Sequence, residues 1–376
     1  MKKNTAFVVA VIIAALSGFF AVQAVQDTSA RAAVIMDVNS SRILYSKNMD
    51  EKLAMASTTK IMTTLVAIES GRLEEEVTVS RNASYTGGSS VYLREGEKHT
   101  VRDLLYAIML RSGNDAAVAV AEHIGGSVEG FAELMNEKAR EIGASDTHFA
   151  NPHGLDTGEH YTTAHDLALI TSYALRNPVF ADIVSSKKKV IKGPPGENWD
   201  RVMINKNKML WQFEGGDGVK TGFTNKAGRC LVSSATRDGM RLVCVVLNCG
   251  PMWEDSSSLL EAAFKDYSSR KIVEGDSIFK VVGVRNGKEK FVGVKPAEDF
   301  TLAMRADEIE NVKFETKNMT VAQAPLKKGD EAGKLEVYLG NTLMGAIKLE
   351  YTEDVESSSP FFYLKRILRD FCTDKG

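Results

Sequence analysis

Ser57 and Lys60 form a Ser-x-x-Lys pattern that could carry out nucleophilic catalysis. A serine hydroxyl is a weak nucleophile and needs a base to take its proton. Residues three apart on a helix share a face, so the Lys60 amine can reach the Ser57 hydroxyl. Burial and a nearby cation can lower a lysine pKa until the uncharged amine accepts that proton. The same pattern recurs at Ser185 and Lys188, so it is weak evidence by itself.

Two further motifs carry groups that could relay a proton or bind a substrate. Ser112–Asn114 reads Ser-Gly-Asn after a predicted helix, where a hydroxyl and an amide can project into a cleft. A helix C-cap with glycine is the commoner use of such a triplet. Lys220–Gly222 reads Lys-Thr-Gly on a predicted strand, where an amine and a hydroxyl can hold a carboxylate. The glycine would let a ligand approach the backbone, although a surface strand with a bulge is the simpler interpretation.

Four histidines in one polar segment, His148, His153, His160 and His165, raise the alternative of a zinc peptidase. Catalytic zinc takes three protein ligands and keeps one position open. The spacing is not His-Glu-x-x-His, and polar loops with histidines are usually only loops. We therefore predict no metal and no cofactor.

The composition limits the class of protein. The chain has 376 residues, 44% hydrophobic and 26% charged, which predicts two or three globular domains and excludes a largely disordered or multi-span membrane protein. With 47 basic and 49 acidic residues the net charge is -2, so no overall basic field exists to hold nucleic acid. Four cysteines are too few for a disulfide scaffold.

The N-terminus predicts export. Two lysines precede an apolar run from Ala6 to Val22, and a small-residue site follows at Ala24, which is typical of a cleaved signal peptide over residues 1–24. An uncleaved anchor is the alternative, because the 17-residue run is at the lower limit for spanning a bilayer. Either interpretation places the folded part outside the cytoplasm.

The cysteines could oxidise there, but their register argues against pairing. If Asp238 and Gly239 form a two-residue hairpin turn, Cys244 faces Ser233 and Cys230 faces Leu247. We therefore predict unpaired thiols.

Residues 25–270 combine helices with strands, as expected for an α/β (α+β) domain. The predicted helices are Thr58–Glu69, Val101–Arg111, Ala116–Ile124, Phe131–Ile142, His165–Arg176 and Ser256–Tyr267. The predicted strands are Ala33–Val38, Arg42–Tyr45, Gly218–Thr224, Cys230–Thr236 and Leu242–Leu247. A long loop is predicted over His148–Asp166 and a hard turn over Gly193–Gly196.

The pattern changes near residue 271. Residues 271–356 show short strands and tight turns without a helical period, including hairpin signals at Asn286-Gly287 and Gly340-Asn341. We predict a small all-β sandwich domain there.

Residues 357–376 are predicted to form a serine-rich linker and an amphipathic helix. Phe361, Leu364, Leu368 and Phe371 recur at helical spacing, with basic residues on the other side. A helix of a dozen residues is too short to cross a core of about 30 Å, so we expect it to lie on the membrane surface. An ordinary terminal helix docked on its own domain is the alternative.

The three motifs occur in the order Ser-x-x-Lys, Ser-x-Asn, Lys-Thr-Gly, separated by 55 and 108 residues. That order is the signature of penicillin-binding proteins and serine β-lactamases. The surrounding sequence closely resembles the low-molecular-mass penicillin-binding D-alanyl-D-alanine carboxypeptidases over nearly the whole mature chain. The resemblance implies the penicillin-binding/serine β-lactamase type of catalytic domain, with an antiparallel sheet flanked by helices. It also implies that Asn151–Asp156 is an active-site loop.

The resemblance assigns roles residue by residue. It implies that Ser57 attacks the bond between two D-alanines of a peptidoglycan stem pentapeptide, that Lys60 takes its proton, and that Ser112 relays a proton to the leaving amine. By the same resemblance, the remaining site residues would bind substrate: Asn114 an amide, Lys220, Thr221 and Arg241 the terminal carboxylate, and Gly222 and Phe223 the strand edge and oxyanion. β-Lactam antibiotics would acylate Ser57. Some family members carry histidine where this chain has Phe223, which bears on substrate preference and deacylation speed.

Three related readings remain open at this stage. A β-lactamase needs a glutamate-activated water, but no Glu-x-x-x-Asn pattern occurs in the His148–Asp166 loop, and Gly113 stands where lactamases usually have aspartate. A transpeptidase is possible, although the chain lacks a glycosyltransferase-like region. A wall-binding or β-lactam-sensing module that does not turn over would need the same groups.

Overall fold

The computed structural model describes residues 28–194, 196–319 and 321–358. The predicted signal peptide at 1–24 and the predicted amphipathic segment beyond Pro360 lie outside the described residues.

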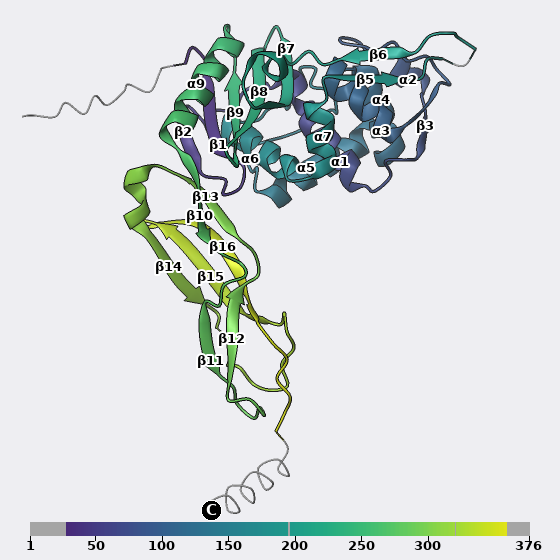
Figure 1. Ribbon diagram of the computed structural model, residues 1–376. Coiled ribbons are helices and arrows are strands. Elements are labelled where there is room, and N and C mark those ends of the chain that lie inside the picture. Colours follow the sequence, from purple (N-terminus) through teal and green to yellow (C-terminus); the bar gives the residue numbers. More distant parts are fainter. Residues whose placement is uncertain (1–27, 195, 320, 359–376) are drawn as a thin grey trace, which may run out of the picture.

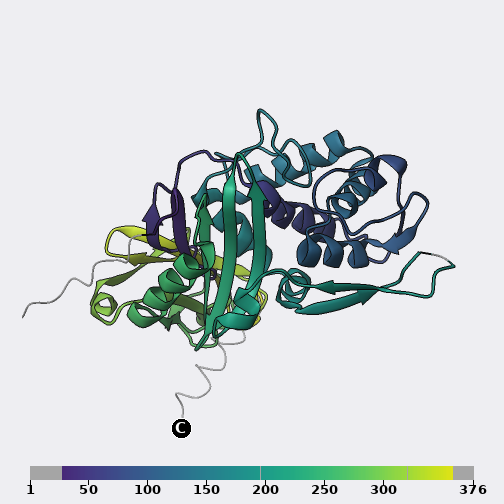
Figure 2. The ribbon, with the colours of Figure 1, turned by 90° about the horizontal axis from the view of Figure 1, so that it is seen from above.

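A five-stranded antiparallel sheet with the strand order β2-β1-β9-β8-β7 forms the centre of the N-terminal part (Figure 2). Its strands are β1 (Ala32–Asp37), β2 (Ile43–Lys47), β7 (Gly216–Thr224), β8 (Gly228–Arg237) and β9 (Met240–Leu247). Successive side chains of β1 point to opposite faces, so Val34 joins one hydrophobic core and Ile35 joins another. The sheet is therefore covered on both faces.

Helices supply both covers (Figure 1). They are α1 (Lys60–Glu69), α2 (Arg81–Ser84), α3 (Val101–Tyr106), α4 (Asn114–Gly125), α5 (Val128–Ile142), α6 (Ala164–Leu175), α7 (Pro178–Ser185), α8 (Met209–Gln212) and α9 (Met252–Asp266). α9 packs on the face of Ile35 through Leu259 and Leu260. On the opposite face α1 and α3 to α7 build the larger core, which includes Ile61 and Phe131. This arrangement confirms the predicted fold class.

Two predicted helices are interrupted where catalytic motifs occur. The helix predicted over Thr58–Glu69 begins with a 3-10 turn, η1 (Ala56–Thr59), before α1. The helix predicted over Val101–Arg111 ends in a π-helical turn, η2 (Ala107–Arg111), after α3. The π-turn is followed by Ser112 in the left-handed region, with φ of 66°. The left-handed conformation of Ser112 ends the helical path at the second motif.

Several elements were absent from the sequence prediction. α7 is capped by Asn177, whose side chain accepts from the N–H groups of Val179 and Phe180, with Pro178 in the first turn. That cap is a recognisable signal. Two short hairpins were also missed: β3 (Glu76–Thr78) with β4 (Lys98–Thr100), and β5 (Lys188–Ile191) with β6 (Arg201–Ile204). The predicted hard turn lies between β5 and β6, which extend as an arm (Figure 2).

The predicted register of the β8–β9 hairpin is confirmed. Arg237 pairs with Met240 across the turn, and Ser233 pairs with Cys244. Cys230, Cys244 and Cys249 are free and buried, as predicted, and burial raises the pKa of the Cys244 thiol to about 12. The fourth cysteine lies outside the described residues.

The C-terminal part is all-β, as predicted (Figure 1). Its strands are β10 (Ser268–Val273), β11 (Lys280–Gly283), β12 (Phe291–Pro296), β13 (Phe300–Met304), β14 (Val312–Lys317), β15 (Glu331–Leu339) and β16 (Thr342–Tyr351), with a 3-10 turn η3 (Ala306–Asn311). β10 and β13 form one small sheet, and the other five strands form a second in the order β11-β12-β16-β15-β14. Both predicted hairpins, β11–β12 and β15–β16, are present.

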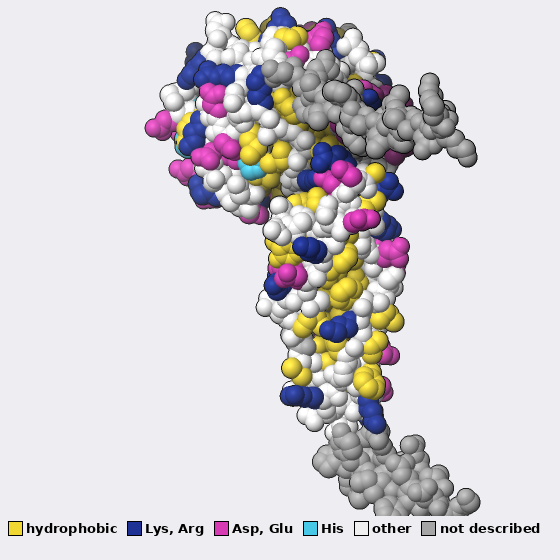
Figure 3. Space-filling view, turned by 90° about the vertical axis from the view of Figure 1, so that its left-hand side faces the viewer, with side chains coloured by type: hydrophobic (Ala, Val, Ile, Leu, Met, Phe, Trp, Pro, Cys, Tyr) yellow, Lys and Arg dark blue, Asp and Glu magenta, His cyan; other side chains and the backbone are white. Residues whose placement is uncertain are grey.

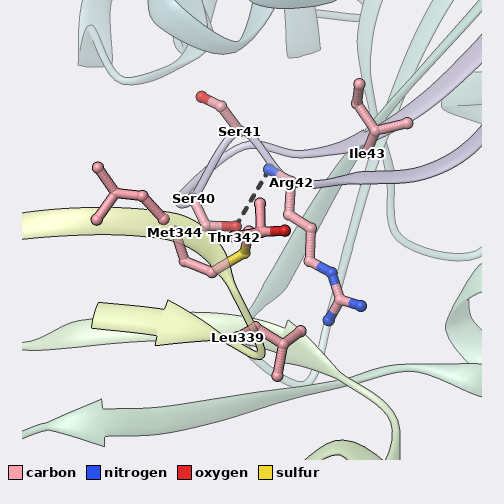
Figure 4. A pocket seen from close by; sticks show the side chains of 8 residues that line it. Ser40, Ser41, Arg42, Ile43, Leu339, Thr342 and Met344 are labelled. Atoms are coloured by element: carbon pink, nitrogen blue, oxygen red, sulfur yellow. Dashed lines mark hydrogen bonds between the residues drawn. The ribbon is translucent and has the colours of Figure 1, made fainter. Parts of the chain in front are cut away.

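A polar junction joins the two parts. The Arg42 guanidinium donates to Glu308 at 2.6 Å and to the Ala303 carbonyl at 2.7 Å. Beside it, a hollow of about 420 Å³ lies between the turn at Ser40–Ile43 and the β15–β16 hairpin (Figure 4). None of the predicted site residues lines this hollow.

The described surface is mixed in charge. On the face shown in Figure 3, Lys and Arg side chains are interspersed with Asp and Glu, and hydrophobic side chains recur down the β part. Within residues 28–194, 196–319 and 321–358, the helices are either too short or too polar to cross a bilayer.

Candidate active site

The Ser57 turn brings the first motif together. Ala56 opens the 3-10 turn η1 with φ of 48°. Two hydroxyls stabilise this turn: Thr58 donates to the Met55 carbonyl at 2.6 Å, and Thr59 donates to the Ala56 carbonyl at 2.8 Å. Lys60 then opens α1 with its side chain fully buried. Its Nζ lies 3.1 Å from Ser57 Oγ, as the spacing predicted.

Three oxygens surround the Lys60 amine. Besides Ser57 Oγ, its Nζ donates to Asn114 Oδ1 at 2.7 Å and to the His153 carbonyl at 2.6 Å. The pKa of Lys60 is lowered well below its usual value, first by burial and then by the positive charge of Lys220. Asp115 opposes this effect without cancelling it.

This geometry suits an uncharged amine that accepts a proton. A neutral amine has two hydrogens and one lone pair. Asn114 Oδ1 and the His153 carbonyl can only accept hydrogen bonds, so they take the two hydrogens. The lone pair is left for the third neighbour, Ser57, whose hydroxyl can donate.

The second motif supplies one group to the cleft and one behind it. Ser112 is buried but lines the cleft. Asn114, the first residue of α4, is buried and has both ends of its amide occupied, because Nδ2 donates to the Gly87 carbonyl at 2.7 Å. Asp115 holds the same segment, accepting from the N–H groups of Val91 and Leu93.

The third motif lies on the edge strand β7. Gly222 approaches the Ser57 turn so closely that a Cβ there would lie 3.0 Å from Ser57 N and 3.1 Å from the Met55 carbonyl oxygen. A side chain at this position would require the strand or the Ser57 turn to shift by a few tenths of an ångström. Lys220 is buried behind the strand, donates to the Thr221 carbonyl at 2.9 Å, and has its pKa lowered to about 7 by burial and by Lys206.

The Asn151–Asp156 loop closes over the same turn. Asn151 Oδ1 accepts from Gly154 N at 2.7 Å and from His153 N at 3.2 Å, which folds the loop back on itself. Gly154 has φ of 90°, and a Cβ there would lie 1.9 Å from the Ala56 carbonyl oxygen. Only glycine fits, and this tight contact lets the loop present the His153 carbonyl to Lys60.

The four histidines do not converge. His160 Nε2 lies 2.7 Å from Thr59 Oγ1, and burial lowers the pKa of His160 to about 4. His148 contacts the Glu159 carbonyl, and His165 lies 3.7 Å from Asp166. Across the described part of the chain, no cluster of His, Cys, Asp and Glu is placed to hold a metal ion.

A cleft of about 310 Å³ opens in front of Ser57. It is lined by Ser57, Ser89, Ser112, Lys206, Thr221, Gly222, Phe223, Arg229, Met252 and Trp253. Lys60, Asn114 and Lys220 lie buried behind this lining. The sequence prediction missed Ser89, Lys206, Arg229 and the two α9 residues. Of these, only Ser89 carried a signal, as part of a Gly-Gly-Ser-Ser turn.

Arg241 does not line the cleft. β9 is not the neighbour of β7, since β8 lies between them. Arg241 pairs with Thr236 next to the hairpin turn, whereas Thr221 is level with Leu231 near the far end of β8. The Arg241 guanidinium lies 3.0 Å from Asp217 and donates to the Leu175 carbonyl, so it serves the structure and not the cleft.

Comparison with known proteins extends over nearly the whole chain. Residues 20–250 match the family described as D-alanyl-D-alanine carboxypeptidase, and residues 267–357 match the penicillin-binding protein 5 C-terminal domain. The chain is 33% identical to D-alanyl-D-alanine carboxypeptidase DacF of Bacillus subtilis, covering 91% of this chain and 90% of that protein.

Solved structures agree with the sequence matches. Penicillin binding protein 5 of Haemophilus influenzae superposes with a TM-score of 0.73 at 31% identity, covering 88% of this chain and 98% of that one. The PBP3 structure of Streptococcus pneumoniae gives 0.76 at 26% identity, covering 88% and 100%.

Proposed function

Because the chain belongs to the D-alanyl-D-alanine carboxypeptidase family of serine peptidases, we propose that Ser57 is the residue through which it hydrolyses the bond between two D-alanines. The substrate would be a stem pentapeptide of peptidoglycan, and β-lactams would acylate the same hydroxyl. The single observation that carries this assignment is the buried Lys60 amine, 3.1 Å from Ser57 Oγ and held by two acceptors.

In the acylation step, the Ser57 proton passes to Lys60 Nζ while Oγ bonds to the penultimate D-alanine carbonyl carbon. The carbonyl oxygen becomes an oxyanion, and the N–H groups of Ser57 and Phe223 would stabilise it. The close approach of Gly222 to Ser57 N supports this pairing of donors.

In the steps that follow, Ser112 relays the proton from Lys60 Nζ to the departing amine: its hydroxyl donates to the amine and is reprotonated by Lys60, and D-alanine leaves as the C–N bond breaks. Water then loses a proton to Lys60 Nζ and adds to the acyl carbon, the bond from that carbon to Ser57 Oγ breaks, and the proton returns from Lys60 to Ser57. Asn114 Oδ1 and one of the two Nδ2 hydrogens are already bonded, which leaves the second hydrogen for a substrate amide. We therefore assign Asn114 to positioning Lys60 as well as to binding that amide, with Lys220 and Thr221 on the carboxylate side of the cleft.

The function is tested by incubating the protein with a pentapeptide that ends in D-Ala-D-Ala. We expect release of one D-alanine per peptide, measured by mass analysis, with no effect of EDTA. The matched control is a peptide ending in L-Ala-L-Ala, which should stay intact. Activity that EDTA abolishes and zinc restores would instead support chemistry at the histidines.

The finer organisation of the chain is also a proposal. We assign residues 1–24 to an export signal, 25–270 to the catalytic domain, 271–356 to the β domain, and 357–376 to a linker and an amphipathic segment. This segment would bind peripherally to the extracytoplasmic face of the cell membrane. In support, Ser357 bridges to Gly287 in the β11–β12 turn, and the β11–β12 hairpin reaches the end of the β part away from the catalytic sheet (Figure 1).

Deleting residues 361–376 should therefore release the protein from anionic vesicles without changing D-alanine release. The physical reason is that the basic and apolar side chains of the segment supply the lipid contacts, while the cleft lies at the opposite end. Vesicle sedimentation and a peptidase assay measure the two properties. If the deletion variant stays bound to vesicles, the segment is not the anchor.

A further inference from the structure

We propose that one face of the β5–β6 arm (Figure 2) binds stem peptides that neighbour the scissile one on the same peptidoglycan polymer. The inference rests on the proposed function for its ligand, a polymer whose peptides end in carboxylates. Residues 187–208 contain seven basic and two acidic residues, whereas the whole chain has a net charge of -2. Positive charge is therefore concentrated on the arm, where it attracts anions.

Strand alternation gathers part of this charge on one side of the arm. Val190 pairs with Val202, and Lys188 pairs with Ile204. Every second side chain of the two strands is exposed, and the alternation continues beyond the end of β6. We define the outer face of the arm as the exposed side chains of Lys188, Val190, Lys192, Val202, Ile204, Lys206 and Lys208. Three exposed β-branched side chains thus lie between lysines.

The opposite side of the arm fixes it to the helical part of the molecule. Arg201 is buried there, and its guanidinium donates to the carbonyls of Val91 and Tyr92 at 3.1 and 2.8 Å. It also forms a buried ion pair with Glu97 at 2.9 Å. Met203, two residues along the same strand, is buried as well. These contacts hold the arm in one orientation, with the outer face toward solvent.

The outer face is continuous with the cleft. Lys206 belongs to both, since it also lines the cleft together with Ser57. Lys208 Nζ lies 5.9 Å from the ring centre of Trp253, another residue of the cleft lining. From Val202 to Lys206 an extended backbone covers about 13 Å, the length of roughly four residues of an extended peptide. A polymer with one stem peptide in the cleft can therefore lay a second one along the arm.

The charge and polarity of the outer face fit such a peptide. Both acidic residues of the arm are already paired, Asp200 with Lys192 at 3.2 Å and Glu197 with Arg94 at 3.0 Å. Within the described chain, the other three lysines of the outer face form no ion pair with Asp or Glu. A peptide that ends in D-Ala-D-Ala offers a carboxylate to these amines and methyl groups to the valines and the isoleucine.

The test compares a soluble pentapeptide with uncrosslinked polymeric peptidoglycan that carries the same pentapeptide. For the double variant Lys188→Gln/Lys208→Gln we expect kcat/KM on the polymer to fall by about threefold to tenfold, with kcat/KM on the soluble pentapeptide unchanged. The preference of the wild type for the polymer should decline as the salt concentration rises, because salt screens exposed charges. The matched control is Lys280→Gln/Lys290→Gln, which removes two exposed lysines from the β11–β12 hairpin.

Binding without turnover separates this inference from the proposed function. Ser57→Ala protein should sediment with the polymer, and should bind less when the two arm lysines are also replaced. It should also bind less when the stem carboxylates of the polymer are converted to amides. If the wild type releases no D-alanine from the soluble pentapeptide but sedimentation follows this pattern, the proposed function alone fails.

Three results would overturn the inference about the arm. The first is equal binding to the amidated polymer or to glycan strands stripped of their peptides. The second is an arm variant that loses activity equally on the polymer and on the soluble pentapeptide. The third is a control variant that loses as much activity on the polymer as the arm variant does. Equal thermal midpoints for wild type and variants show that the fold is retained.

Discussion

Replacing Ser57 by alanine should abolish both covalent labelling by penicillin and release of D-alanine. The hydroxyl held 3.1 Å from the buried Lys60 amine would be lost, and no acyl-enzyme could form at this position. Removing a serine nucleophile elsewhere costs on the order of 10⁶ in kcat, and we expect a loss of similar size. The measurement is mass analysis of the penicillin adduct together with a D-alanine assay.

The chain provides its own matched control for this experiment. Ser185 and Lys188 repeat the Ser-x-x-Lys spacing, but the Ser185 hydroxyl donates to the Asp182 carbonyl and Lys188 is exposed on β5. Ser185→Ala should label and hydrolyse as the wild type does. Penicillin bound to any residue other than Ser57 would refute the assignment of the nucleophile.

Lys60→Arg should lower the rate of acylation by about a thousandfold, since a general base typically contributes 10²–10⁴. Arginine stays protonated in proteins and cannot take the Ser57 proton. The charge is conserved, so the loss reports on proton acceptance and not on charge alone. Stopped-flow acylation by a chromogenic cephalosporin measures the rate.

The pH dependence gives this prediction a second readout. Only uncharged Lys60 can accept a proton, and burial together with Lys220 lowers its pKa well below 10.5. Acylation of the wild type should therefore slow as the pH falls through that lowered pKa, because the amine becomes protonated. Lys60→Arg should lose this limb, whereas Lys188→Arg, the control on the repeated motif, should keep it. A limb that persists in Lys60→Arg would assign the base to another group.

The loop glycine shows how far sequence reasoning reaches into the site. The motif residues could be chosen from the sequence because nucleophilic catalysis requires particular side-chain types at a spacing that one helical turn can satisfy. The contact between His153 and Lys60 could not be predicted from the sequence, because the group that contacts Lys60 is the backbone carbonyl of His153. Every residue has one, so no residue type marks it. Its position depends on Gly154 fitting against Ala56.

The sequence by itself determined the pairing of Ser57 with Lys60, the all-β C-terminal part and the β8–β9 register. These follow from local rules: side-chain chemistry, strand alternation and a two-residue turn whose facing positions are set by counting. Only the tertiary structure decided which arginine lines the cleft, that the four histidines stay apart, and that Asn114 accepts a hydrogen bond from Lys60. Those outcomes depend on strand order and on loop packing between residues far apart in the chain. Local sequence patterns specify neither of them.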